Sequence, residues 1–154
     1  MTACVVEVGP EAVCGPGSVS LQKVSVALEC IDDRLALMDD GVIAVDDLWR
    51  DVLGAAADGA DGPVVIVVPT WWSAGRLDVV VAAAHTVFAD CIVVPRSVVL
   101  SSEATIVELS TDWIVVTSAS SEPQVFPRGS LDVEAHLAGS SSLVIDTPSG
   151  VQPL

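Results

Sequence analysis

The strongest constraint in this sequence is a run of five consecutive aliphatic residues, Val64–Val68, enclosed by two prolines. A strand that is apolar at every position has to be buried on both faces, as strands are in parallel sheets covered by helices. Segments with apolar residues at helical spacing lie on either side, at 46–58 and 73–88, and a second short apolar run follows at 91–94. Residues 46–94 therefore predict an αβαβ series with parallel-sheet crossovers.

The first 45 residues have a different pattern. Short β-branched runs are separated by Gly-Pro and Asp-Gly turns, which is typical of antiparallel hairpins. We expect an antiparallel meander here, with strands at 3–8, 11–14, 24–30, 34–38 and 42–45.

Strand signals return after a polar link at 96–104. The predicted elements are strands at 105–109, 113–118 and 124–126, a short helix at 131–138 capped by Ser130, and a strand at 143–146. The chain thus predicts an α/β fold, in which a βββαβαβ unit is followed by a partial second βββαβ unit. We expect a first subdomain at 1–100 and a partial second subdomain at 101–154.

Composition and charge exclude several classes of protein. The chain of 154 residues has 51% hydrophobic residues, so it is not intrinsically disordered. Six basic residues against 21 acidic ones give a net charge of −15, which argues against binding to nucleic acid or to an anionic membrane surface. No apolar run approaches the length of a membrane span, and the first residues lack a basic, signal-like segment, so we expect a cytoplasmic protein without membrane insertion. The absence of Asn and Tyr and the single Lys indicate a high-GC bacterium, such as an actinobacterium.

The doubled unit resembles the actin-like ATPases, which have a ribonuclease H-like fold and include the Hsp70 chaperones. The similarity is carried by Val65-Ile-Val-Val-Pro69-Thr-Trp-Trp-Ser73, by Arg76 and by Ile92-Val-Val-Pro95. In that family a strand ends in Val-Pro, a capped helix follows, and a further strand leads to a proline. The resemblance implies an actin-like fold over roughly the first 119 residues.

The family's phosphate-binding hairpins are altered in this chain. Their first motif, Asp-x-Gly-Thr/Ser, here begins with Glu7 and keeps Gly9, but Pro10 lacks a backbone donor and Glu11 would repel phosphate. The second motif begins with Glu108 and has lost both glycines. Glu7, Gly9 and Glu108 are therefore the remnant phosphate and Mg²⁺ positions, and we expect a lost nucleotide site with no cofactor. The alternative is a weak ATP-binding or ATP-hydrolysing protein that uses Glu7 and Glu108.

Within this group the chain is similar to the N-terminal region of the actinobacterial (mycobacterial) type VII secretion-associated protein family. The matching residues are Val5-Val6-Glu7-Val8-Gly9-Pro10, Asp47-Leu-Trp-Arg50 and Val67-Val68-Pro69. The resemblance implies a non-catalytic accessory protein whose partners are proteins, among them components of the secretion apparatus. Because an actin-like second half carries two more αβ units, we expect this chain to be the N-terminal part of a longer protein. A third hypothesis is an obligate homo-oligomer that covers an open sheet edge.

A few residue types require separate treatment. Two adjacent tryptophans, Trp71 and Trp72, cannot both face one core, so they are the candidates for contact with a partner. The paired aspartates lack the spacing of a Ca²⁺ loop, so turns and caps are expected and no metal site is predicted. His85 and His136 have no Cys or Ser at catalytic spacing. The sequence therefore predicts an interaction protein rather than an enzyme.

Overall fold

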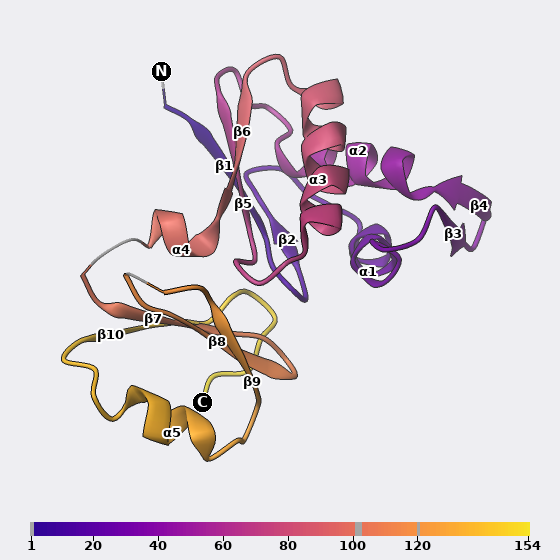
Figure 1. The fold of residues 1–154 in the computed structure, drawn as a ribbon. Helices are drawn as coiled ribbons and strands as arrows, with labels where there is room; N and C mark the ends of the chain where they lie inside the picture. The colour runs from indigo at the N-terminus through magenta and orange to yellow at the C-terminus, as the bar shows by residue number, and fades with distance from the viewer. Residues whose placement is uncertain (1, 101–102, 120) are drawn as a thin grey trace.

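The computed structural model describes residues 2–100, 103–119 and 121–154 and has a mixed α/β fold (Figure 1). It contains two four-stranded sheets, ordered β2-β1-β5-β6 and β10-β7-β8-β9, and a two-stranded sheet, β3-β4. The predicted α/β class is confirmed. Up to the end of the first sheet, the elements are β1 (Cys4–Val8), β2 (Val13–Cys14), α1 (Leu21–Glu29), β3 (Leu35–Met38), β4 (Gly41–Ala44), α2 (Val45–Ala56), β5 (Val64–Val68), α3 (Ala74–Val87) and β6 (Cys91–Pro95). The remaining elements are α4 (Arg96–Val99), β7 (Thr105–Leu109), β8 (Trp113–Thr117), β9 (Gln124–Pro127), α5 (Asp132–Leu137) and β10 (Leu143–Asp146).

The first sheet is built on the aliphatic run that dominates the sequence. Strand β5 lies between β1 and β6 and is parallel to both, while β2 pairs with β1 in an antiparallel hairpin. Helices α2 and α3 lie against the same face of this sheet (Figure 1). The core between these layers contains fully buried Val6, Ile66, Trp49 and Val80. The predicted αβαβ series is confirmed.

The predicted strand at 24–30 is wrong, because this segment belongs to helix α1. The hydroxyl of Ser20 accepts a hydrogen bond from the Lys23 amide at 3.4 Å, which caps the helix start. Val24, Ala27 and Ile31 are buried at the spacing of one helix face. Since α1 interrupts the meander, β3 and β4 form their own hairpin beside α1 and α2 instead of joining the first sheet.

The second sheet follows the predicted βββαβ order. Strands β7, β8 and β9 are antiparallel, and β10 returns after α5 to pair in parallel with β7. The short helix begins later than predicted, at Asp132, and the Ser130 hydroxyl accepts a hydrogen bond from the Asp132 amide at 3.2 Å. Part of the predicted polar link is helical, because residues 96–99 form α4. Residues 101 and 102 of that link lie outside the described residues.

The two large sheets share one arrangement of strands. In each, the first strand of an antiparallel hairpin also pairs in parallel with a strand that follows a helix, β1 with β5 and β7 with β10. Each sheet lies in one of the two predicted segments, and the division of the chain near residue 100 stays a prediction. None of the helices in the described residues has the length and apolar character that a membrane span requires.

Candidate functional site

The candidate site lies between the two sheets, where the two glutamates singled out in the sequence occupy matching positions. Glu7 is the fourth residue of β1 and Glu108 is the fourth residue of β7. A tight turn follows each strand, closed by a hydrogen bond from the Gly9 amide to Ala12 at 2.7 Å and from the Ser110 amide to Trp113 at 2.9 Å.

Arg96, at the start of α4, connects the two sheets. Its Nε and Nη2 donate to the Asp146 carboxylate at 2.5 and 3.0 Å, and its Nη1 donates to Glu7 Oε2 at 3.3 Å. Arg96 is only 7% exposed, and its hydrogen bonds with Asp146 raise its pKa. A guanidinium therefore lies between carboxylates of the first and the second sheet, and it is charged at any physiological pH.

Glu108 is almost fully buried and is held by the loop that follows β5. Its carboxylate accepts a hydrogen bond from the Thr70 amide, at 3.1 Å to Oε1 and 3.4 Å to Oε2. The Thr70 hydroxyl in turn accepts a hydrogen bond from the Ser97 amide in α4 at 3.0 Å. Burial raises the pKa of Glu108, and the Thr70 hydrogen bond and the nearby Arg96 charge oppose that shift. The carboxyl group faces protein atoms, with 1% of the residue exposed to solvent.

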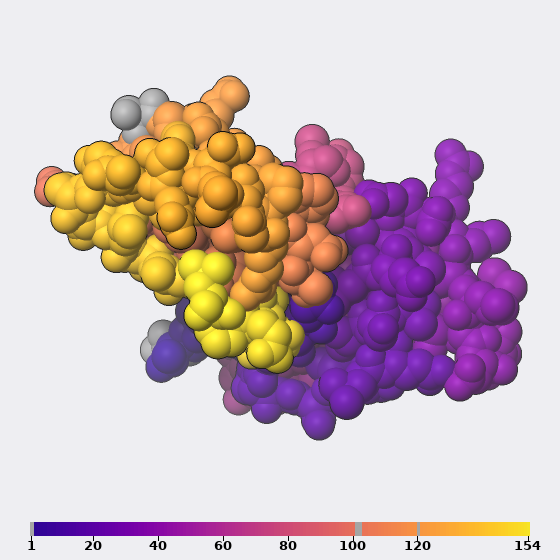
Figure 2. Space-filling view, turned by 90° about the horizontal axis from the view of Figure 1, so that it is seen from below, coloured from indigo at the N-terminus to yellow at the C-terminus, as the bar shows by residue number. Residues whose placement is uncertain are grey.

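The two hairpin turns touch each other directly. The Thr111 hydroxyl donates a hydrogen bond to Glu11 Oε1 at 2.5 Å, which joins the turn after β7 to the turn after β1. A Cβ added at Gly9 would lie 3.4 Å from Pro148 Cβ, and one at Gly150 would lie 3.0 Å from Glu11 Cβ. The segment after β10 thus packs against the first turn, as Figure 2 shows for the C-terminal residues (yellow) beside N-terminal ones (indigo).

Arg128 holds this C-terminal segment in place. Its Nη1 donates to the Ser110 carbonyl at 2.8 Å, and its Nη2 donates to the carbonyls of Gln152 and Pro153.

The cavity beside Glu7 and Arg96 measures about 110 Å³. Typical small-molecule sites measure about 300–1,000 Å³, so this cavity alone is too small for a nucleoside triphosphate. A larger cavity, of about 440 Å³, lies at the two hairpin turns and is lined by Glu11, Thr111, Arg128, Gly150 and Gln152.

The two tryptophans have different environments. Trp72 is 7% exposed, and its ring packs edge-on against Trp49 with 6.3 Å between centroids. Trp71 is half-buried, and the Arg76 guanidinium lies 6.0 Å from its ring centroid. Arg76 is oriented by hydrogen bonds to Asp32, which also lower the pKa of that carboxyl group. Of the two predicted contact residues, Trp71 is the one with appreciable exposed surface.

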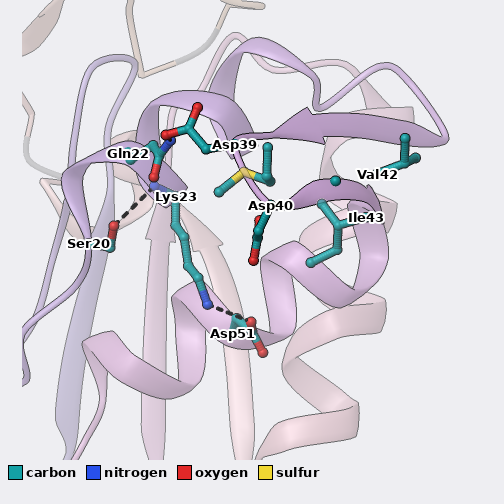
Figure 3. A pocket seen from close by; sticks show the side chains of 10 residues that line it. Ser20, Gln22, Lys23, Asp39, Asp40, Val42, Ile43 and Asp51 are labelled. Carbon is teal, nitrogen blue, oxygen red and sulfur yellow. Dashed lines mark hydrogen bonds and ion pairs between the residues drawn. The ribbon is translucent and has the colours of Figure 1, made fainter.

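Another hollow, of about 390 Å³ and away from the two turns, lies between α1, the β3–β4 hairpin and α2 (Figure 3). Lys23 Nζ forms an ion pair with Asp51 at 2.8 Å, and this contact raises the lysine pKa. Gln22 donates a hydrogen bond to Asp39 at 2.6 Å. These polar groups pair with one another across the hollow, which fits a structural role in attaching the hairpin to the helices.

His85, for which the sequence offers no Cys or Ser at catalytic spacing, lies close to a cysteine in the structure. Cys91 Sγ and His85 Nδ1 are 3.6 Å apart. A nucleophilic thiol needs a lowered pKa, but burial and the neighbouring Asp90 raise the pKa of Cys91. This Cys–His contact therefore lacks the character of a catalytic dyad.

No metal-binding cluster of three or more His, Cys, Asp or Glu side chains occurs within residues 2–100, 103–119 and 121–154.

Comparison with protein-family models, with curated proteins and with solved structures found no match to this chain.

Proposed function

We propose that this chain is a non-catalytic protein-interaction module built on a degenerate actin-like fold whose nucleotide site has been replaced by contacts within the protein. The observation that carries the proposal is the position of Arg96. Its guanidinium binds Glu7 and Asp146, in the region where an actin-like ATPase would place Mg²⁺ and phosphate between its two hairpins.

The strand arrangement supports the actin-like part of the proposal. Both sheets start from a hairpin whose first strand pairs in parallel with a strand that comes after a helix, as a duplicated actin-like unit requires. The first sheet differs from that pattern because helix α1 takes the place of its third meander strand.

The contacts between the turns disfavour the alternative of a weak ATPase. Glu7 is engaged by Arg96 and Glu108 by Thr70, so both carboxylates already have partners within the protein, and Glu108 is almost inaccessible to a metal-bound water. Pro10 offers no amide to a phosphate, and Glu11 is hydrogen-bonded to the opposite turn.

Calorimetric titration with Mg²⁺–ATP tests the loss of the nucleotide site. We expect no binding heat under conditions in which an actin-like ATPase of known affinity gives a full isotherm. Micromolar affinity would contradict the proposal, and ATP hydrolysis abolished by Glu7→Gln would establish the alternative instead.

The resemblance to the type VII secretion-associated family extends the proposal to the partner. We expect this chain to act as an accessory protein in the cytoplasm and to co-purify with a component of the secretion apparatus from its native host. Light scattering distinguishes this from the homo-oligomer hypothesis, because a monomer at high concentration would exclude an obligate oligomer.

A further inference from the structure

The first sheet is covered by α2 and α3 on one face, while on the other face only α4 lies against β5 and β6, where Val67 is buried, and the rest is open. Helices α2 and α3 cover the face that carries Val6 and Ile66, both fully buried (Figure 1). On the opposite face Val5 is 48% exposed and Ile92 is 56% exposed. Parallel strands are normally covered on both faces, so this second layer is incomplete.

The exposed residues form a continuous apolar surface. Val5 is in register with Val65, and Val65 is in register with Ile92, so the three form a row across β1, β5 and β6. Val94 lies two residues along β6 on the same face, and Val99 of α4 lines a small cavity together with Val5. We call Val5, Val65, Ile92, Val94 and Val99 the open sheet face.

Apart from Arg96, which lines the small cavity beside Val5 and is paired with Asp146 and Glu7, the charges near the open sheet face are negative. Asp61 and Asp90 are exposed where β5 and β6 begin, and within the described residues neither forms an ion pair. Glu7 lies on the same face farther along β1; its side chain is 51% exposed, but its charge is already paired with Arg96, so Asp61 and Asp90 are the unpaired acids here. A second copy would bring another net charge of −15 to this surface, so self-association is disfavoured and a basic partner is favoured.

We propose that the open sheet face binds a cationic amphipathic helix of a partner protein. The apolar stripe of this helix completes the missing layer over Val5, Val65 and Ile92, and its lysines and arginines face Asp61 and Asp90. A helix is the element that covers parallel strands in α/β folds, and an amphipathic helix presents apolar residues at the required spacing. This inference rests on the proposed function, because it names the surface and the chemistry by which the interaction module acts.

The direct test uses synthetic helical peptides of about 18 residues, or five turns, built from Leu and Lys with the leucines on one face. Binding to the full chain is followed by fluorescence anisotropy. We expect saturable binding that weakens with added salt. A peptide of the same composition with scattered leucines is expected to bind much more weakly, and so is a Leu/Glu peptide with the same stripe. Equal binding of the Leu/Glu peptide would overturn the charge complementarity.

Matched variants locate the surface. Val5→Thr combined with Ile92→Thr removes two apolar contacts while keeping β-branched residues in the strands, and we expect an affinity loss of about tenfold or more. Leu35→Thr combined with Val42→Thr makes the same change on the exposed outer face of the β3–β4 hairpin. We expect this control to bind within about twofold of the parent. If the hairpin variant alone loses peptide affinity, or if neither variant does, the assignment of the binding site to the open sheet face is overturned.

The two proposals fail separately. Absence of any saturable binding by the Leu/Lys helix would remove the open sheet face as a helix site and would leave the nucleotide result unaffected. Binding of Mg²⁺–ATP would refute the interaction-module proposal, whatever the peptides do. If light scattering shows a dimer that Val5→Thr with Ile92→Thr dissociates, the occupant is a second copy and the partner-helix proposal is overturned.

Discussion

Replacing Arg96 by methionine tests whether the buried ion pairs hold the two sheets together. Methionine keeps the length and the apolar stem of the side chain but removes the charge and all donors. The change leaves Asp146, whose side chain is 12% exposed, without its hydrogen-bonding partner. Glu7 also loses a partner, but its side chain is 51% exposed and water replaces the contact.

The expected loss of stability follows from this difference in burial. Removing one member of a buried ion pair costs about 3–5 kcal/mol, because the remaining charge is left buried and unpaired. Since Glu7 contributes little, we take the lower end, about 3 kcal/mol. For a chain of this size each kcal/mol corresponds to about 2–4 °C, so Arg96→Met is expected to lower Tm by about 6–12 °C.

Urea unfolding monitored by circular dichroism and tryptophan fluorescence measures this loss. Arg50→Met is the matched control, because Arg50 pairs with Asp47 at 2.6 Å on the surface, and about 0.5 kcal/mol or less is expected. Arg96→Met combined with Asp146→Leu removes both charges and should recover most of the lost stability. Equal effects of Arg96→Met and Arg50→Met, or no recovery in the double variant, would refute this account of the buried pair.

Three further predictions follow from individual contacts. Because burial raises the pKa of Glu108, the folded state binds its proton more tightly than the unfolded state, and the parent loses stability as pH rises past the ordinary carboxyl range. Glu108→Gln does not titrate, so its stability relative to the parent should increase between pH 4 and pH 8 in urea unfolding, and a constant difference would contradict this. A Cβ at Gly17 would lie 2.0 Å from the Ala55 carbonyl oxygen, whereas one at Gly139 meets nothing within 4 Å. In thermal unfolding, Gly17→Ala should therefore lower the free energy of unfolding by about 1–3 kcal/mol, while Gly139→Ala stays near the parent. Equal stabilities of the two variants would show that the loop at Gly17 relaxes to accept the methyl group. In urea unfolding, Trp72→Ala should lower the free energy of unfolding by about 3–5 kcal/mol, and Trp71→Ala should lower it clearly less. The reverse order would mean that Trp71 is the core residue.

The parts of the fold that the sequence predicts well have one dominant local signal. Strand β5 is apolar at every position, so only a buried central strand suits it. Helix α3 starts at a side chain that can cap it, and the Ser73 hydroxyl accepts a hydrogen bond from the Arg76 amide at 3.4 Å. In both places the local preference and the tertiary burial agree, which makes the prediction reliable.

The incorrect strand at 24–30 has conflicting local signals. Val24, Val26 and Leu28 alternate with other residues, which fits a strand, whereas Val24, Ala27 and Ile31 fit one face of a helix. Both periods are present in so short a segment, and packing against α2 selects the helix. The cap residue Ser20 was the available sign of the helix start.

The site could be predicted only in part, because its central residue comes from neither hairpin. Glu7 and Glu108 are visible in the sequence as acids near strand ends, but Arg96 is 89 residues from Glu7 and 50 residues from Asp146 along the chain. No local pattern joins such distant residues. The available indication was chemical, since a buried acid requires a partner and this chain has only six basic residues.

The position of Arg96 changes the reason for expecting no nucleotide. From the sequence alone, the expected obstacle is repulsion between the acidic turns and the phosphates. In the structure Arg96 lies between Glu7 and Asp146 and offsets part of that negative charge, so repulsion is weaker than the count of acids suggests. The stronger obstacle is that the donors are already in use: the Arg96 guanidinium is bound by Asp146 and Glu7, the Thr111 hydroxyl by Glu11, and the Arg128 guanidinium by backbone carbonyls. Adding positive charge to the turns should therefore fail to restore ATP binding unless these contacts are also removed.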